Sequence, residues 1–420
     1  FFTPSGRPLL DARLGVLLLL FLLALGLAPL DLAMPTPMEL LVTLALGVLL
    51  FLALLVLGRA SRRARARRHE RVCVFTFANH KGGVGKTTSA LFVARRLAAE
   101  DPARKVLVID CSIYGDLTRL LLGTASTFAS NNDGAEGWLV AGGNTIEHYA
   151  AALLRTRSGP FAFLRHRAPD VRAHLYSLKD SQPSAPANLY LMSSCAQWSH
   201  RSNSRGASAL PTLDGVDANA VAVVAQVLRA SLASGEEDCS WIVLVDTDGG
   251  VLHELTKLAL CVADSVIVPA NADTADARRL HVMLRYMAEL HAKGNSTGTI
   301  DLCFFTALKV KANEPTEKSE ALGLGFAVLD DVWSEMGKLA SQFDELRAEF
   351  PQLLARLEPV DAKRTKGRGH FFAGIRHGGV TLQRMKDRPY STELSDAVRG
   401  DFDELCKRID QLASAKELTY

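Results

Sequence analysis

The 420-residue chain has no closely spaced pair of cysteines. Its seven cysteines are odd in number and widely scattered, and no C-x-x-C pair occurs. Zinc ribbons and thioredoxin-like redox motifs need such pairs, and a disulfide framework needs a dense, even set. We therefore expect reduced thiols in the core of a cytosolic domain, at Cys73, Cys111, Cys195, Cys239, Cys261, Cys303 and Cys406.

A large excess of either charge is also missing. The chain has 48 Lys and Arg against 45 Asp and Glu, which gives a net charge of +3. No stretch interleaves basic and aromatic residues in a pattern that reads nucleic-acid bases. This balance argues against bulk binding of polyanions, and any electrostatic function must come from local clusters.

Charged residues are absent from two long apolar segments near the beginning, at residues 14–30 and 40–58. As helices with a rise of about 1.5 Å per residue they measure roughly 26 and 29 Å, close to the hydrocarbon thickness of about 30 Å. The sequence thus predicts a transmembrane hairpin over residues 1–58, with helices at about 14–33 and 38–58. The alternative is that the first segment is a cleaved signal peptide.

Arginines lie at the two outer ends of the hairpin and not in the connector between its helices. Arg7 and Arg13 precede the first segment, an Arg-rich linker at residues 59–71 follows the second, and the short connector has no Lys or Arg. The positive-inside rule then places both ends in the cytoplasm. The run from Arg59 to Arg71 is also expected to contact anionic lipid headgroups.

Beyond residue 71, short apolar runs alternate with longer amphipathic stretches. This pattern is typical of an α/β fold with a mostly parallel twisted sheet and helices on both faces. Strands are expected at residues 72–78, 105–110, 189–192, 242–246, 265–270 and 302–306. Helices are expected at residues 87–99, 218–232, 274–292, 335–357 and 393–413.

Two stretches of this part are less regular. Residues 124–187 are rich in small and polar residues, and we expect a surface insertion with one or two helices. Residues 361–391 are basic and rich in glycine, which predicts a loop or an appended element. The apolar stripe of the last helix predicts docking on the domain core; it comprises Leu394, Val398, Phe402, Leu405, Ile409 and Leu412.

A glycine-rich decapeptide, N-H-K-G-G-V-G-K-T-T at residues 79–88, lies between a predicted strand and a predicted helix. The general phosphate-loop pattern, G-x-x-x-x-G-K-[ST], has glycine where His80 stands. Glycines in the loop let backbone N–H groups converge on phosphate oxygens. The strand-loop-helix context therefore indicates a nucleotide site in spite of His80.

The remaining loop residues fit the same chemistry. Lys86 is expected to neutralise the β and γ phosphates, and the Thr87 hydroxyl to complete the shell of a Mg²⁺ ion. The predicted nucleotide-binding residues are Gly82, Gly83, Val84, Gly85, Lys86, Thr87 and Thr88.

The stretch K-G-G-V-G-K-T-T resembles the deviant Walker A motif of the ParA/MinD family of P-loop ATPases. The resemblance implies that Lys81 reaches across a nucleotide-sandwich dimer to the phosphates of the partner. His80 then lies in a loop built to a different rule, and ATP with Mg²⁺ is the implied cofactor.

The resemblance extends over roughly residues 72–310. In the second motif, V-L-V-I-D-C-S-I-Y-G-D-L-T, Asp110, Gly115 and Thr118 match the family's aspartate, glycine and threonine. The stretch W-I-V-L-V-D-T-D-G-G resembles the Walker B strand, which implies that Asp246 holds Mg²⁺ through water. The implied catalytic residues are Lys81, Lys86, Asp110 and Asp246; the implied metal site is Thr87 and Asp246.

Three positions depart from the family pattern. Ser112 stands where the second motif has its second aspartate, Tyr114 replaces the common glutamine, and Thr247-Asp248-Gly249-Gly250 replaces a proline-containing turn. Loss of a water-positioning carboxylate typically slows a reaction about 10²- to 10⁴-fold. We therefore expect ATP binding with hydrolysis that is slow, dependent on a partner, or assisted by another acid such as Asp248.

The predicted hairpin and the resemblance together lead us to expect a membrane-anchored ATPase of the bacterial inner (cytoplasmic) membrane. Its catalytic domain, at residues 72–357, lies in the cytoplasm, forms a homodimer through nucleotide, and positions or partitions DNA or a protein complex. A protein partner that stimulates hydrolysis is also implied. Residues 358–420 hold the last helix and the basic residues from Lys363 to Arg388, which are candidates for non-specific DNA contacts or a solvated loop.

Two other functions fit parts of the pattern. A membrane scaffold that uses ATP only to hold a dimer is favoured by Ser112. A bacterial tyrosine kinase of polysaccharide export shares the two membrane helices and the deviant loop. Such kinases normally have a large domain between the helices and a tyrosine-rich tail, whereas this tail has only Tyr390 and Tyr420.

Overall fold

The computed structural model describes most of the chain beyond residue 71. Of the two compact units, Phe1–His69 and Glu70–Tyr420, only the second contains described residues. The described residues are 72–113, 115–122, 143–157, 169–194, 213, 216–233, 240–250, 253–271, 274–306, 310–312, 327–328, 338, 341–342, 344–357, 371–372, 380–385, 388–394 and 396–418. The predicted hairpin at residues 1–58 and the linker at 59–71 lie outside them. None of the described helices is long and apolar enough to cross a membrane.

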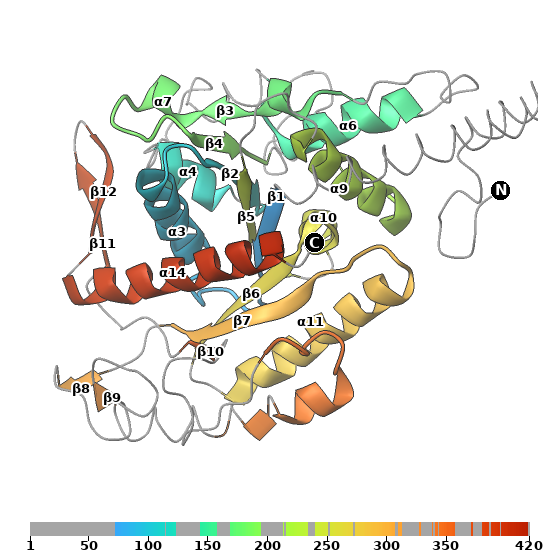
Figure 1. Cartoon of the computed structure of the whole chain (residues 1–420), viewed down its shortest axis with the longest axis vertical. Helices are drawn as coiled ribbons and strands as arrows, with labels where there is room; N and C mark the ends of the chain where they lie inside the picture. Colours follow the sequence, from blue (N-terminus) through green and yellow to red (C-terminus); the bar gives the residue numbers. More distant parts are fainter. Residues whose placement is uncertain are drawn as a thin grey trace, which may run out of the picture. The chain divides into compact units, whose positions relative to one another are not determined.

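A sheet of eight strands forms the centre of this unit (Figure 1). The strand order is β10-β7-β6-β1-β5-β2-β4-β3, and every neighbouring pair is parallel except β3 with β4. The mostly parallel sheet expected from the sequence is thereby confirmed. The strands are β1 Val72–Phe77, β2 Lys105–Cys111, β3 Tyr176–Ser177, β4 Leu189–Met192, β5 Trp241–Thr247, β6 Ser265–Ala270, β7 Thr299–Phe305 and β10 Phe371–Phe372.

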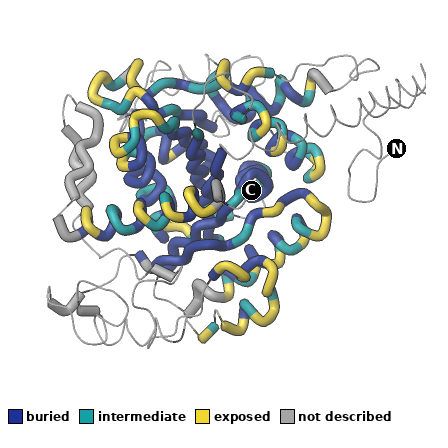
Figure 2. The backbone as a smooth tube through the Cα atoms, viewed as in Figure 1, coloured by how far each residue is buried: buried dark blue, intermediate teal, exposed yellow. Residues whose placement is uncertain are grey.

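Alternating side chains of the central strands enter two separate apolar clusters, one on each face of the sheet. In β1, Val72 and Val74 belong to one cluster, while Phe75 and Phe77 belong to the other. The first cluster is covered by α6 (Ile146–Arg157), α9 (Ala218–Ala233), α10 (Glu254–Val262) and α11 (Thr274–Ala292). The second is covered by α3 (Lys86–Glu100), α4 (Asp116–Leu122), α7 (Leu178–Ser181) and α14 (Asp396–Leu418). Most of the strand residues whose burial is described are accordingly buried, and exposed residues concentrate on the helices (Figure 2).

The last helix, α14, docks on this core as its apolar stripe predicts. Phe402 lies against Phe92 of α3 with a ring-centroid distance of 4.6 Å. Ion pairs flank the apolar contact, from Arg96 to Asp403 at 3.1 Å and from Arg104 to Asp410. The prediction began the helix too early, however, because residue 394 belongs to strand β12 (Arg388–Leu394). The helix also runs on to Leu418 instead of ending at 413.

The predicted helix at residues 335–357 is too long. Residues 344–349 are helical, but residues 351–357 form turns. Pro351 accounts for the ending because proline lacks an N–H donor and disfavours the α conformation of the residue before it. The turn still packs inward, since Leu353, Leu354 and Leu357 are buried in the first cluster.

The two irregular stretches contain more structure than expected. Within 124–187 the chain forms α6, the short helix η2 (Val171–His174), β3 and α7. The sequence prediction of a surface insertion missed β3, which extends the main sheet beside β4. Within 361–391, β10 pairs with β7, and β11 (Val380–Met385) forms an antiparallel hairpin with β12. A second small sheet joins β8 (Val310–Ala312) to β9 (Ala327–Val328).

Five of the cysteines lie in the described residues, and all five are buried free thiols. Burial raises the pKa of Cys261 to about 12. It also raises the pKa of Cys303 and Cys406 above the usual range of a thiol. These side chains therefore act as small apolar groups of the core.

Candidate nucleotide site

The phosphate loop connects the end of β1 to the start of α3. Gly83 and Gly85 have φ angles of 73° and 81°, in the left-handed region that favours glycine. A Cβ atom added at Gly82 or Gly83 would meet no other atom within 4 Å, so this side of the loop is open. The buried Lys86 donates a hydrogen bond from Nζ to the carbonyl oxygen of Lys81 at 2.8 Å, which draws the loop around its ammonium group.

Polar residues at the carboxyl ends of neighbouring strands hold the phosphate loop through hydrogen bonds. Thr306, after β7, donates from Oγ1 to the carbonyl oxygen of Val84 at 2.9 Å. Asn79 donates from Nδ2 to the carbonyl oxygen of Pro269 at 2.7 Å, which links the loop to β6. Sequence reasoning missed the roles of Thr306 and Asn79. Their position at the carboxyl ends of predicted parallel strands, where α/β proteins gather functional groups, was the available signal.

Asp110 and Asp246 lie side by side on adjacent strands. The parallel register pairs Asp110 of β2 with Asp246 of β5, and both side chains are fully buried. Asp246 is also paired with Phe77, the last residue of β1, so that it lies next to the phosphate loop. The sheet thus brings together the two carboxylates that the sequence places 136 residues apart, between positions 110 and 246.

Asp110 is fully engaged in holding the start of α4. It accepts hydrogen bonds from Ser112 N at 3.0 Å, Thr118 N at 2.8 Å and Thr118 Oγ1 at 2.7 Å. Gly115, with φ of 64°, lets the chain turn between these donors. Burial raises the pKa of Asp110 to about 6 in spite of the three hydrogen bonds. The aspartate, glycine and threonine of the second motif therefore form one loop-closing unit.

Asp246 has the opposite surroundings. Neither carboxylate oxygen has a hydrogen-bond partner among the described residues. Burial, followed by the nearby Asp110, raises the pKa of Asp246 well above its usual range. The Thr87 hydroxyl and the Lys86 ammonium oppose this shift, although neither makes a hydrogen bond of normal geometry to the carboxylate. A buried, unpaired carboxylate beside a threonine hydroxyl fits a Mg²⁺ ion held through water, because hard cations prefer oxygen ligands.

Lys86 and the two aspartates form one electrostatic group with Asp248. Burial lowers the pKa of Lys86, while Asp246 and then Asp248 raise it. Lys81 is half-buried at the loop, and Thr87 and Thr88 lie in the first turn of α3. The residues predicted for the site therefore gather at the carboxyl edge of the sheet, while Ser112 lies buried beside Asp110.

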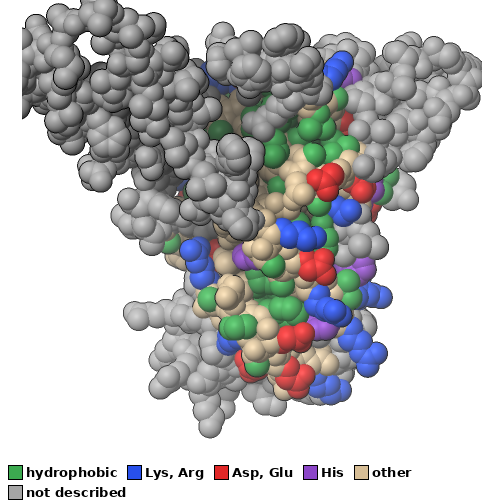
Figure 3. Space-filling model, turned by 90° about the vertical axis from the view of Figure 1, so that its right-hand side faces the viewer, with side chains coloured by type: hydrophobic (Ala, Val, Ile, Leu, Met, Phe, Trp, Pro, Cys, Tyr) green, Lys and Arg blue, Asp and Glu red, His purple; other side chains and the backbone are tan. Residues whose placement is uncertain are grey.

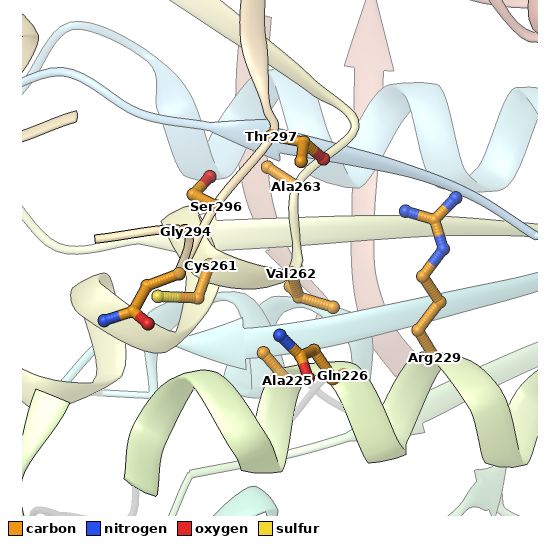
Figure 4. Close-up of a pocket in the computed structure, with 10 residues that line it drawn as sticks. Ala225, Gln226, Arg229, Cys261, Val262, Ala263, Gly294, Ser296 and Thr297 are labelled. Atoms are coloured by element: carbon orange, nitrogen blue, oxygen red, sulfur yellow. The ribbon is translucent and has the colours of Figure 1, made fainter. Parts of the chain in front are cut away.

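A separate pocket of about 150 Å³ lies at the end of the sheet where the parallel strands begin, opposite the phosphate loop (Figure 4). Its lining includes Arg229 of α9, Cys261 at the end of α10, and Ser296 in the segment before β7. These elements lie at the amino ends of β1, β6 and β7, whereas the phosphate loop follows the carboxyl end of β1. Arg229 forms an ion pair with Asp264 and donates to the carbonyl oxygen of Val72 at 3.3 Å. The pocket is therefore distinct from the phosphate-loop site.

The predicted basic cluster from Lys363 to Arg388 has its side chains outside the described part of the structure. Residues 361–370 lie outside the described residues, as do the side chains of β11 and β12. On the face drawn in Figure 3, basic, acidic and apolar side chains are interspersed, and the described residues form no extended basic surface there. Non-specific DNA binding through Lys363–Arg388 thus stays a prediction.

Comparisons with known proteins fit this geometry. The sequence profile of the family described as the CobQ/CobB/MinD/ParA nucleotide binding domain matches residues 75–399. A search of curated proteins found no match. The matched region begins within β1 and includes the phosphate loop, both aspartates and the start of α14.

Solved structures with a similar chain trace include three kinds of protein. An ATP complex of a McdA variant from Cyanothece is 16% identical, with 83% of this chain and 98% of that chain covered and a TM-score of 0.47. A putative plasmid partition protein from Borrelia burgdorferi bound to AMPPNP is 17% identical, with 81% and 99% covered and a TM-score of 0.42. Cobyrinic acid a,c-diamide synthase from Mycobacterium smegmatis with ADP and magnesium is 19% identical, with 57% and 76% covered and a TM-score of 0.36. At these values the likenesses support no functional conclusion, and family membership rests on the profile match.

Proposed function

Because the chain belongs to the CobQ/CobB/MinD/ParA nucleotide-binding domain family, we propose that it is a membrane-anchored ATPase of the ParA/MinD type. It binds Mg-ATP, dimerises through the nucleotide, and positions or partitions a cargo. The observation that supports this proposal most directly is the unpaired, fully buried carboxylate of Asp246 beside Thr87 and Lys86. A buried carboxyl group without hydrogen-bond partners is costly, and a site for a cation is its simplest explanation.

In this proposal each part of the phosphate loop has its own role in nucleotide binding. The open glycine backbone at Gly82 and Gly83 accepts the phosphates, and Lys86 exchanges the carbonyl oxygen of Lys81 for phosphate oxygens. Thr87, and Asp246 through water, would hold a Mg²⁺ ion, which would neutralise phosphate charge. Asp110, at the end of β2, holds Thr118 of α4 and so fixes the loop that connects β2 to α4 beside the site.

Nucleotide titration of the full-length chain tests the binding step. Lys86→Ala removes a charged donor worth about 1.5–3 kcal/mol, so we expect ATP affinity to fall roughly 10- to 150-fold. Lys179→Ala, at an exposed position of α7, is the matched control and leaves the affinity unchanged. Equal ATP affinities of the wild type and Lys86→Ala would contradict the proposed site.

The dimer is tested through Lys81. With a non-hydrolysable ATP analogue, we expect the wild type to form dimers in light scattering, because the family resemblance assigns Lys81 to the partner's phosphates. Lys81→Ala should bind the analogue yet remain monomeric, whereas Lys86→Ala should bind the analogue more weakly and therefore form fewer dimers at the same analogue concentration. A wild type that remains monomeric with bound analogue would refute the dimer and leave nucleotide binding intact.

The membrane anchor is proposed from residues 1–58, whose two apolar segments match the hydrocarbon thickness. We expect the full chain to stay in the membrane pellet after washing with alkaline carbonate, which removes peripheral proteins. Protease added to inside-out vesicles should digest the ATPase domain, because the arginine flanks orient both ends toward the cytoplasm. Release of the chain by carbonate would refute the anchor.

A scaffold that holds ATP without turning it over is the second candidate. Ser112 favours it, because a serine hydroxyl cannot serve as the carboxylate expected at that position.

An ATP-locked dimer recovered from membranes should bring its cargo with it, and nucleoid DNA in the recovered fraction would favour partitioning. Absence of DNA, together with a stoichiometric protein partner, would favour positioning of a protein complex.

A further inference from the structure

The turn that follows β5 lies directly on the phosphate loop. Thr247 donates from Oγ1 to the carbonyl oxygen of Phe77 at 2.8 Å, which ties the turn to the end of β1. A Cβ atom added at Gly249 would come within 3.1 Å of Gly82 N and 3.4 Å of the carbonyl carbon of Lys81. The turn is therefore hydrogen-bonded to β1 at Thr247 and closely packed on the phosphate loop at Gly249, with Asp248 between the two.

The Asp248 carboxylate is fixed at one oxygen and available at the other. Gly249 N donates to Oδ1 at 2.7 Å. No described residue hydrogen-bonds to Oδ2, and the side chain is partly exposed. Asp248 is bonded to Gly249, whose backbone lies against Gly82 N, so the carboxylate lies at the loop that meets the phosphates in the proposed complex. Its charge also raises the pKa of Lys86.

Three other described carboxylates near the site are differently engaged. Asp110 is fully buried and accepts three hydrogen bonds. Glu147, at the start of α6, is buried and accepts from Ser194 Oγ at 2.7 Å. Asp116 is exposed on α4 and pairs with Arg119 at 3.8 Å. Asp248 thus combines proximity to Lys86 with access to solvent, from which an attacking water comes.

We propose that Asp248 supplies the water-positioning carboxylate that Ser112 lacks. This inference rests on the proposed binding of ATP. Oδ2 of Asp248 accepts a hydrogen bond from a water, whose oxygen forms a bond to the γ-phosphorus. The bond from phosphorus to the bridging oxygen breaks, its electron pair leaves with ADP, and the proton of the water passes to an oxygen of the released phosphate. Asp248 is a positioning residue in this step and ends it unchanged.

The test compares substitutions of Asp248 in the full-length chain with Asp180→Asn, an exposed control on α7. We expect Asp248→Asn to lower the turnover of ATP about 10²- to 10⁴-fold. Asp248→Glu keeps a carboxylate and should recover at least a tenth of the wild-type rate. Asp180→Asn should hydrolyse ATP as the wild type does.

Nucleotide affinity distinguishes a positioning role of Asp248 from a purely structural one, because a structural role would lower ATP affinity together with turnover. Removing a negative charge near the γ-phosphate leaves ATP affinity unchanged or tightens it, and leaves ADP affinity unchanged. The ATP-loaded Asp248→Asn dimer should also last as long as one formed with a non-hydrolysable analogue. Wild-type turnover in Asp248→Asn, or a loss of ATP affinity beyond about threefold, would overturn the inference.

Failure of the proposed function is distinguishable from failure of this inference. A wild type that does not bind ATP refutes both. A wild type that binds ATP but shows no turnover overturns the role of Asp248 and leaves the nucleotide site in place.

Discussion

The Thr118 hydroxyl offers a quantitative test of how the second motif holds the site together. Thr118 is buried and donates from Oγ1 to Asp110 Oδ2 at 2.7 Å. Thr118→Val keeps the shape of the side chain and removes only this donor, so little cavity is created. The two backbone donors to Asp110 remain. The change in stability therefore reports the hydrogen bond itself.

The expected loss depends on the charge of Asp110. Its folded pKa of about 6 is above the unfolded value of 3.8, so the native chain binds more protons than the unfolded chain between these values. The raised pKa therefore contributes stability that is complete below about pH 4 and is lost as the pH rises through 6. At pH 7.5 Asp110 is ionised, and a hydrogen bond to a charged group is worth about 1.5–3 kcal/mol. At pH 5 the carboxyl is largely protonated, and the bond is worth about 0.5–1.5 kcal/mol.

Thermal unfolding of the full chain measures the difference. With an unfolding entropy of about 2.1 cal/mol/K per residue over roughly 350 residues, Thr118→Val should lower Tm by about 2 to 4 °C at pH 7.5. The decrease at pH 5 should be about 1 to 2 °C. Thr118→Ser, which keeps the hydroxyl, should retain most of the stability.

Thr256 provides the matched control. It is buried in α10, and its hydroxyl has no hydrogen-bond partner among the described residues. Thr256→Val should therefore leave Tm unchanged or raise it, because an unsatisfied polar group is replaced by a methyl group. Equal decreases for Thr118→Val and Thr256→Val would refute the reasoning, as would a larger decrease for Thr118→Val at pH 5 than at pH 7.5.

Three further predictions concern close packing. Gly249→Ala should weaken ATP binding about tenfold or more, because its Cβ crowds Gly82 N of the phosphate loop at 3.1 Å. Gly250→Ala is the control, because its Cβ meets no atom within 4 Å. Equal ATP affinities of the two variants would contradict this effect of the contact. Phe402→Ala removes a buried ring and should cost about 3–5 kcal/mol, seen as a decrease in Tm of roughly 4 to 7 °C, and an unchanged Tm would mean that α14 is not part of the core. The described cysteines, with Cys261 as the least buried, should resist alkylation at pH 7.5 until the protein unfolds; mass spectrometry of the native protein would reveal a fast-reacting thiol if this is wrong.

Local patterns predicted the elements whose signals are contiguous in the chain. Strands β4 and β6 and helix α11 have the bounds expected from periodicity. Pro351 was a visible stop signal that the helix prediction at 335–357 passed over. Strand β3 could not be seen in the same way, because two residues carry no period and gain their strand conformation only from pairing with β4.

The phosphate loop and the family resemblance followed from the sequence alone, because their glycines, lysines and threonine are neighbours in the chain and act through local backbone conformation. The roles of the aspartates did not. Asp110 and Asp246 both end an apolar strand, yet one accepts three hydrogen bonds and the other accepts none among the described residues. Only the tertiary structure decided this, since the partners of a buried carboxylate come from loops and strands that are distant in sequence. The same holds for Asp248, whose proximity to the loop depends on the parallel pairing of β1 with β5.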